Sequence, residues 1–437
     1  MFLIHFHKVG EIVNSLEFQY YKRYSKDRYN MTHLTHLTPF IKKQYFSGGT
    51  RVNLEKETEL NTILKQIIKN TLKINRFDIL SRYQEHNHSP STRNMHSCQL
   101  LFWVNSKVLF YDLYEDELFL VNDHIIGNNF SMDKIYIIGF SDLLNISRYY
   151  SEFALYLSIL DAGHVLFNVK NTLNLLGNKY GCYKSFNVTE VLKQLDIPLD
   201  SSYASFLVEM DRPNGELEIE VDVKQKRIAT LKTFNELKPT AYVSQLLEHF
   251  KLKEIGSFIP MHDEIGFSYN KVRNSAHTMV GNFNISEQFD KLNAREAVLS
   301  IGRVKNCITN PEINFCIVEK EKITFDNGSN QNISVDFSKI LYNDHEFFDL
   351  QTYSKVVVCY SNEKLIKKDG LISTIISAGE LMQAFCLHSA EKGYAFRPMK
   401  NHNDEYLKEI LELDNTWEIN YIGVLCNSPV TQIREYL

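Results

Sequence analysis

The sequence predicts an α+β protein in which one module occurs twice. The same six elements follow one another in residues 100–211 and again in residues 314–426. Each copy combines short apolar strands with one long apolar helix, a mixture typical of α+β domains. A chain of 437 residues, 44% of them hydrophobic, is also long enough to form two such cores. We therefore expect two tandem α+β domains, each with a mixed sheet and a long central helix.

The long helices show the repeat most clearly. Residues 158–177 and 374–393 both carry Ala-Gly followed by a polar residue, and both end on a glycine, Gly177 and Gly393. Apolar residues recur at helical spacing through both segments. A glycine directly after the last turn of a helix adopts the left-handed conformation at little cost. The pattern predicts two long buried helices, each ending at its glycine.

The other elements recur at a nearly constant offset and set the domain boundaries. Residues 1–50 are an aromatic and basic lead segment, 51–221 the first domain, 222–260 a polar connection with one helix, and 261–437 the second domain. Two similar domains in one chain commonly pack about a pseudo-twofold axis, as the subunits of a homodimer do. We expect such a pseudo-dimer, with the long helices in contact. The corresponding pairs are strands 100–105 and 314–319, hairpins 110–121 and 324–335, strands 134–140 and 354–360, short helices 188–196 and 405–414, and strands 203–211 and 420–426.

Composition excludes several classes of function. The net charge is −5, from 48 Lys and Arg against 53 Asp and Glu, so nucleic acid is not an expected partner. The seven cysteines include no Cys-x-x-Cys pair, which favours a reducing, cytoplasmic setting. No signal peptide and no window of about 18–20 apolar residues is found, so no membrane is expected. The histidines near residues 33–36 and 86–96 lack a completing ligand set, and no metal is expected.

The two copies differ at two polar motifs. Ahead of its first strand the second copy has Arg273-Asn-Ser275, and an arginine fork with a hydroxyl near a helix start suits a phosphate. Residues 57–66 of the first copy have no such pair. The first copy instead has a turn of small polar residues at a strand mouth, which suits the polar edge of a planar ligand. These turn residues are Ser89, Ser91, Thr92 and Asn94.

Each motif alone has an ordinary structural interpretation. An exposed arginine often forms a weak ion pair, Ser and Asn are common turn residues, and tyrosines commonly pack half-buried. His164, on the central helix, is more readily a satisfied interior histidine than a catalyst. Only the order of the motifs along one repeated module favours a functional site.

In that order the residues resemble the nitroreductase-like flavoproteins. The closest likeness is to the SagB-type (McbC-like) thiazoline/oxazoline dehydrogenases of modified-peptide biosynthesis, whose central helix often has Glu-Ala-Gly-His where this chain has Asp161-Ala-Gly-His164. The lead segment and residues 39–54 also resemble the start of that subfamily. In this family flavin mononucleotide (FMN) lies at a dimer interface. The resemblance therefore implies a fused dimer whose motifs complete one FMN site and leave the second site degraded and empty.

The resemblance also implies which residues hold FMN. Arg273 and Ser275 would bind its phosphate, and the turn of the first copy would approach from across the interface. His277 stands where the family pattern has an arginine, so part of the phosphate charge would fall to Lys400 or Arg434. A loop of the second copy would contact the flavin ring, and its residues are Phe396, Arg397, Pro398 and Met399.

The family carries a Lys-Tyr pair before the central helix that assists proton removal. The matching residues are Tyr149 and Tyr150, preceded by Arg148, so the tyrosine is kept and the lysine is lost. We expect Tyr150 to accept the proton, with Tyr149 and Arg148 as supports. A tyrosine, whose ordinary pKa is near 10, is a poor base at neutral pH unless a cation assists it. Arg148, Lys364 or Lys367 would supply that cation.

The resemblance implies an FMN-dependent dehydrogenase that oxidises azoline rings of a ribosomally synthesised precursor peptide, beside a cyclodehydratase partner. Oxygen would reoxidise the flavin, and the sequence has no Gly-x-Gly-x-x-Gly motif for a nicotinamide cofactor. Two alternatives stay open. One is an NAD(P)H-dependent reductase of the nitroreductase type. The other is a scaffold without flavin that only docks a peptide or partner.

Overall fold

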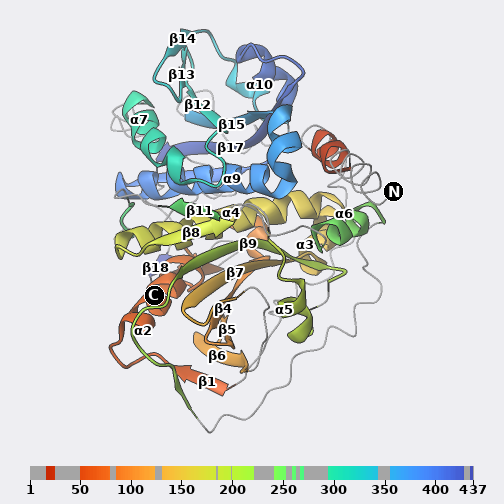
Figure 1. Ribbon diagram of the computed structural model, residues 1–437. Coiled ribbons are helices and arrows are strands. Elements are labelled where there is room, and N and C mark those ends of the chain that lie inside the picture. Colours follow the sequence, from red (N-terminus) through yellow and green to blue (C-terminus); the bar gives the residue numbers. More distant parts are fainter. Residues whose placement is uncertain are drawn as a thin grey trace. The chain divides into compact units, whose positions relative to one another are not determined.

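The computed structural model describes residues 16–24, 50–78, 85–123, 130–183, 186–197, 199–220, 241–251, 258–261, 266–269, 294–342, 355–427 and 434–436. The chain divides into two compact units. Unit 1 comprises Met1–Asn30, Arg76–His86 and Phe267–Leu437, and unit 2 comprises Met31–Asn75 and Asn87–Gly266. Each unit contains one large sheet and one long helix, as the repeat predicts (Figure 1).

Unit 2 is built on a sheet in the order β10-β1-β6-β5-β4-β7-β9-β8-β11. The long helix α4 packs on this sheet against β4, β7 and β9, and α2 packs on α4 (Figure 1). The elements are β1 (Thr50–Asn53), α2 (Glu59–Thr71), η2 (Thr92–Asn94), β4 (Cys98–Val104), β5 (Lys107–Asp112), β6 (Glu117–Asn122), β7 (Lys134–Asp142), α3 (Leu144–Tyr150), α4 (Phe153–Leu175), β8 (Tyr180–Tyr183), α5 (Thr189–Gln194), β9 (Ser202–Asp211), β10 (Glu218–Ile219), α6 (Ala241–Lys251) and β11 (Phe258–Met261).

Unit 1 is built on a sheet in the order β14-β13-β12-β15-β17-β16, with α9 packed on β15, β16 and β17. A smaller sheet, β18-β2-β3, also belongs to unit 1. The elements are a helix at 16–24, β2 (Arg76–Asp78), β3 (Glu85–His86), α7 (Ala294–Val304), η4 (Lys305–Cys307), β12 (Asn314–Val318), β13 (Lys322–Phe325), β14 (Asn330–Asn332), η5 (Phe337–Lys339), β15 (Lys355–Asn362), α9 (Glu363–Glu391), β16 (Tyr394–Met399), α10 (Asp404–Ile410), β17 (Trp417–Asn427) and β18 (Arg434–Tyr436).

The two large sheets share one topology. The order β6-β5-β4-β7-β9-β8 in unit 2 equals the order β14-β13-β12-β15-β17-β16 in unit 1 when the strands are matched along the chain. The helices match as well: α4 and α9 follow β7 and β15, and α5 and α10 precede β9 and β17. The internal repeat detected in the sequence is therefore present in the strand order of the folded units.

The expectation of mixed sheets is wrong for the described residues, in which all paired strands are antiparallel. The reason lies in the long helices. Helix α4 returns the chain, so that β8 runs in the same direction as β7, and β9 then inserts between these two strands, antiparallel to both. The equivalent strand β17 lies between β15 and β16.

The predicted helix ends are confirmed. Gly177 and Gly393 follow α4 and α9 with φ of 70° and 79°, in the left-handed region. At the end of α4 the N–H of Gly177 donates to the carbonyl of Asn174, and that of Asn178 donates to the carbonyl of Leu173. These two bonds form the Schellman arrangement that a glycine at this position favours.

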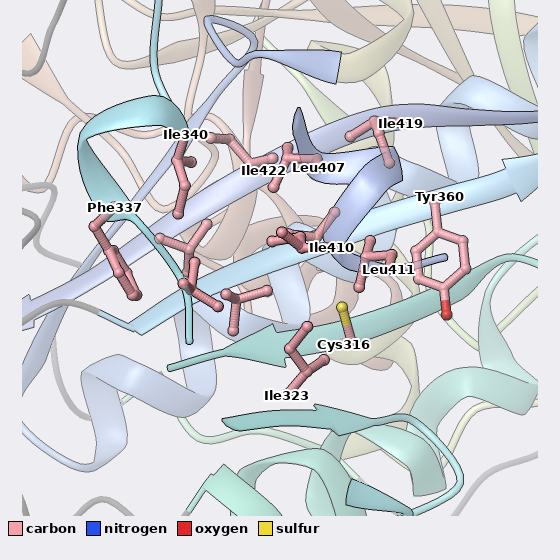
Figure 2. Close-up of a cluster of buried hydrophobic side chains, with 14 of the residues drawn as sticks. Cys316, Ile323, Phe337, Ile340, Tyr360, Leu407, Ile410, Leu411, Ile419 and Ile422 are labelled. Atoms are coloured by element: carbon pink, nitrogen blue, oxygen red, sulfur yellow. The ribbon is translucent and has the colours of Figure 1, made fainter. Parts of the chain in front are cut away.

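Each large sheet of the repeat buries both faces. In β15 the residues Val356, Val358 and Tyr360 point to a cluster that includes α10, because side chains alternate along a strand. Figure 2 shows side chains of this cluster, from β12 (Cys316), β13, β15, β17 and α10, meeting on one face of the sheet. On the opposite face α9 packs through Phe385, whose ring contacts Phe315 of β12 at 5.5 Å. In unit 2, α5 and α4 have the equivalent places.

Two segments distant in sequence from the second copy belong to unit 1. The segment Arg76–His86, expected in the first domain, belongs to unit 1, where β2 pairs with the C-terminal strand β18 and β3 pairs with β2. The lead helix at 16–24 also belongs to unit 1, where Glu17 accepts a hydrogen bond from the N–H of Leu371. The unit boundary falls at Gly266, and the expected connection contributes α6 and β11 to unit 2. Contacts distant in sequence decide these memberships.

Helix α9 meets the length and hydropathy criterion for a membrane span, although the sequence was expected to contain no such segment. Its most apolar window is 89% buried inside the protein. The helix is apolar because it is the central helix of unit 1, with a sheet on one side.

Candidate functional site

The turn that leads into β4 holds the predicted polar residues of the first copy. Arg93, Asn94 and His96 all have positive φ, of 50°, 56° and 48°. Such a turn is strained for side chains with a Cβ and needs fixing by its surroundings. Ser91 contributes to this, because its Oγ accepts a hydrogen bond from the N–H of His96 at 3.3 Å.

Asp161 of the central helix α4 anchors this turn. Its carboxylate accepts hydrogen bonds from the N–H of Thr92, at 3.0 Å to each oxygen, and from the Thr92 hydroxyl at 3.0 Å. The Ser97 hydroxyl donates to the same carboxylate at 2.9 Å. Burial raises the pKa of Asp161 to about 7, although these hydrogen bonds act in the opposite direction. Asp161 was noted in the sequence only for the family resemblance, and its role as anchor becomes visible in the structure.

Ser89 faces the interior of unit 2. Its hydroxyl donates to the carbonyl of Thr71 at 3.0 Å and accepts from Nδ2 of Asn168, on α4, at 2.9 Å. The side chain is 4% exposed. Ser89 therefore ties the turn to α2 and α4, whereas Ser91, Thr92 and Asn94 are half-buried.

Arg93 links this turn to the predicted catalytic tyrosines. Its Nε donates a hydrogen bond to the hydroxyl of Tyr150 at 3.0 Å. Its guanidinium also lies over the rings of Tyr149 and Tyr150, 4.9 and 5.4 Å from their centroids. The structure thus brings two separate predictions, the turn and the tyrosine pair, into one cluster of unit 2.

Arg93 was missed in the sequence, although it lies between two predicted residues, Thr92 and Asn94. The only signal was its place in that turn. The cations named instead were Arg148, Lys364 and Lys367. Lys367 lies in unit 1, where it pairs with Glu363 at 3.0 Å and stacks on Phe18. The side chain of Arg148 lies outside the described residues.

Most of the predicted phosphate site lies outside the described residues. This holds for Arg273, Ser275 and His277, and for the side chain of Arg434, whose backbone forms the start of β18. Lys400 is described and is 7% exposed. Its Nζ donates to the carbonyl of Ile419 at 2.9 Å and contacts Nε2 of His402 at 3.3 Å, within unit 1.

The predicted flavin loop of the second copy is a strand. Residues 394–399 form β16, which pairs with β17 in unbroken register from Tyr394 to Met399. The proline in this segment favours a loop in the sequence, and the observed pairing corrects that assignment to a strand. Phe396 is fully buried and stacks on Phe385 at 5.7 Å. Arg397 and Pro398 are half-buried, and Met399 belongs to the hydrophobic cluster that includes α10.

Unit 1 has a counterpart of the anchored turn. The N–H of Asn310 donates to the hydroxyl of Ser377 at 2.8 Å, and the N–H of Thr309 donates to Glu380 at 2.7 Å. Ser377, like Asp161, directly precedes Ala-Gly of its central helix. Asn310 Nδ2 also donates to Asp369 at 2.8 Å, in the way that Arg93 donates to Tyr150. Both units therefore hold the turn before the first strand by the central helix, but among the described residues only unit 2 places an arginine and tyrosines there.

In the part of the chain that the structure describes, no group of three or more His, Cys, Asp or Glu side chains could hold a metal ion.

No protein-family model matches the sequence, and no curated protein matches it. The fold is similar to that of a proposed nitroreductase from Anabaena variabilis, with a TM-score of 0.63 at 12% identity over 95% of this chain and 99% of that chain. A nitroreductase family protein from Streptococcus pneumoniae TIGR4 matches with a TM-score of 0.25 at 11% identity, covering 34% of this chain and 87% of that chain. A chain of the E. coli microcin synthetase McbBCD complex with truncated pro-MccB17 bound matches with a TM-score of 0.24 at 11% identity, covering 42% and 81%. The last two scores are too low to support a conclusion. The first shows that the chain has an α+β, nitroreductase-like fold over most of its length.

Proposed function

We propose that the protein is an FMN-dependent oxidoreductase that dehydrogenates thiazoline or oxazoline rings of a ribosomally synthesised peptide. The nitroreductase-like fold supports a flavin-dependent oxidoreductase. The choice of azoline rings rests on the resemblance of Asp161-Ala-Gly-His164 and of the tyrosine pair to the SagB-type dehydrogenases. The observation that carries the proposal is the hydrogen bond from Arg93 Nε to the Tyr150 hydroxyl.

The residues of unit 2 fit their share of a flavin site. Ser91 and Asn94 are half-buried, so a hydroxyl and an amide stand at the surface of a turn that Asp161 holds rigid. These groups would hold the polar edge of the flavin, and Arg273 with Ser275 would hold its phosphate. Bound flavin would supply a two-electron acceptor that oxygen regenerates. Ser89, turned inward, would act on the flavin only by fixing the turn.

Tyr150 is the residue that would remove a proton from the azoline ring. Aromatisation breaks two C–H bonds on adjacent carbons, so that one hydrogen leaves as a proton to Tyr150 and the other as a hydride to the flavin. The Arg93 guanidinium donates to the Tyr150 oxygen and so favours a negative charge there. Tyr149 covers the guanidinium and holds it in place. Arg93 thus has the role that the sequence interpretation gave to other cations.

The remaining parts of the proposal concern partners and setting. The two units would form a pseudo-dimer with one working site. The substrate would be a precursor peptide whose azolines a cyclodehydratase partner has made, in the cytoplasm.

Flavin content and turnover test the proposal separately. The purified protein should release FMN, and it should convert a thiazoline or oxazoline peptide to a product lighter by two hydrogens with consumption of oxygen. A protein that consumes NADPH with a simple nitro or quinone acceptor would instead be a reductase. A protein that contains no flavin and cannot be reconstituted would be a scaffold.

Variants assign the residues. Tyr150→Phe should keep FMN and lose turnover, with Tyr149→Phe as the matched control that keeps most of both. Arg273→Ala should lose FMN. Full turnover in Tyr150→Phe would rule out Tyr150 as the proton acceptor, and wild-type flavin content in Arg273→Ala would rule out the phosphate assignment.

A further inference from the structure

The end of α3 sets the position of Tyr150. The turn that carries Arg93 precedes β4, and α3 follows β7, which pairs with β4 in antiparallel register. The turn and α3 therefore lie at the same end of these two strands, where Arg93 reaches Tyr150. Asp142 holds the start of α3, because its Oδ1 accepts a hydrogen bond from the N–H of Leu144 at 2.8 Å. Tyr150 is the last residue of the helix, so its place depends on the joint that follows.

The joint that follows α3 is Ser151, which has a strained conformation. Its φ of 48° and ψ of −130° match the first central residue of a type II′ turn, a position that favours glycine. Its N–H donates to the carbonyl of Ser147 at 2.8 Å, and its carbonyl accepts from the N–H of Ala154 at 3.1 Å. A side chain at this φ and ψ crowds the backbone, so the conformation persists only because the flanking helices hold it.

The side chain of Ser151 gives no reason for a serine at this joint. It is exposed, and its hydroxyl forms no hydrogen bond with the residues that the structure describes. In unit 1 the corresponding joint is Gly370, with φ of 82° and ψ of 171°, between residues 363–369 and the long part of α9. Asp369, directly before it, accepts a hydrogen bond from Asn310 of the unit 1 turn at 2.8 Å. The joint thus brings a residue to the turn in both units, and the unit with the arginine and tyrosines carries the strained one.

Helix α3 has few contacts that oppose movement. It has seven residues, which is too short for a helix to be stable by itself. Among its described side chains only Ile146 is buried. Segments with few buried apolar contacts open at a low free energy. The hydrogen bond from Arg93 to Tyr150 is therefore one of the few described interactions that close the end of α3 on the turn.

We propose that Ser151 is a strained hinge on which α3 swings, carrying Tyr150 away from Arg93 and back. When α3 swings out, Ser151 can adopt a negative φ and its strain is released. This favours the open state by roughly 5- to 150-fold compared with an unstrained hinge. The role of the hinge rests on the proposed function: the open state admits the azoline ring, and closing returns the Tyr150 hydroxyl to Arg93 with the ring in place.

Hydrogen exchange at the Nε–H of Arg93 measures the opening without any flavin chemistry. The full chain is labelled with nitrogen-15 at arginine, and the Arg93 resonance is identified by its absence in Arg93→Lys. Tyr150→Phe removes the acceptor and should speed the exchange at least about tenfold. Ser151→Gly relieves the strain of the closed state, so its exchange should be at least about threefold slower than in the wild type.

Two variants control for other causes of a change in exchange. Ser151→Ala keeps the Cβ and the strain while removing the hydroxyl, and it should exchange as the wild type does. Ser106 has a φ of 61° and lies in the turn after β4, at the other end of that strand from the Arg93 turn. Ser106→Gly therefore makes the same substitution at another strained serine and should leave the exchange at Arg93 unchanged.

Turnover tests the role of the hinge. With a synthetic thiazoline peptide, Ser151→Gly should lower kcat/KM at least about threefold, because fewer molecules are open, and Ser106→Gly should not change it. Slower exchange with an unchanged kcat/KM would overturn the role in admitting substrate.

Unchanged or faster exchange in Ser151→Gly, altered exchange in Ser151→Ala or Ser106→Gly, or unchanged exchange in Tyr150→Phe would overturn the hinge itself. If the wild type does not turn over the thiazoline peptide, the proposed function fails, and the exchange rates still decide whether α3 swings on Ser151.

Discussion

Replacing Asp161 by Asn should remove a pH dependence from the stability of unit 2. Asp161 is fully buried, and its pKa rises from 3.8 to about 7 on folding. The folded state then binds the proton more tightly than the unfolded state does. This contribution to stability is therefore fully present below pH 3.8 and is lost as the pH rises to about 7. An asparagine carries no titrating proton, so the variant lacks this loss.

The expected size follows from the shift. A rise of about three pKa units, at about 1.4 kcal/mol each, corresponds to about 4 kcal/mol over the whole range. Between pH 5 and pH 8 the wild type should lose about 2–3 kcal/mol from this residue. Over that interval the free energy of unfolding of D161N should therefore rise by about 2–3 kcal/mol relative to the wild type.

Tryptophan fluorescence measures the free energy of unfolding of one unit at a time. The chain has two tryptophans, Trp103 in unit 2 and Trp417 in unit 1. In a Trp417→Phe background, urea unfolding followed by Trp103 reports unit 2. Ser97→Ala is the control: it keeps the titrating carboxylate and removes one hydrogen bond that lowers the pKa of Asp161, so the stability of unit 2 should still fall between pH 5 and pH 8, by at least as much as in the wild type. Parallel curves of stability against pH for D161N and the wild type would refute the reasoning.

Three further predictions concern packing. Tyr21→Phe should destabilise unit 1 by about 1–3 kcal/mol, because the buried Tyr21 hydroxyl accepts a hydrogen bond from Nδ2 of Asn420. Urea unfolding followed by Trp417 in a Trp103→Phe background measures this. An unchanged midpoint would show that the lead helix does not depend on this bond. Gly423→Ala should lower the free energy of unfolding of unit 1 by more than about 2 kcal/mol, because the added Cβ would lie 2.0 Å from the ring of Phe396. Gly302→Ala in α7 is the control, since its Cβ would meet nothing closer than 3.7 Å. In the same assay it should raise the free energy of unfolding by about 0.5–1 kcal/mol. Iodoacetamide should label at most one of the seven cysteines before unfolding, because the six described thiols are all buried; rapid reaction of two or more would contradict this packing.

The sequence predicted both the turn and the tyrosine pair of the site, but not the contact between them. The turn was found from its residue types in the first copy of the repeat, and the tyrosine pair from the family resemblance. Their contact was not, because it is made by Arg93, which has no distinguishing pattern and acts only where α3 ends beside the turn. Whether Arg273 and Ser275 join this cluster stays a prediction, since they lie outside the described residues.

The sequence by itself determined the repeat, the order of the elements and the glycines that end the long helices. These features depend on neighbours within a few residues, through apolar periodicity and the left-handed preference of glycine. The tertiary structure alone decided that β9 inserts between β7 and β8, that β2 pairs with β18, and that Asp161 anchors the turn. Each of these depends on which distant backbone and side-chain groups meet, and a local pattern does not encode that choice.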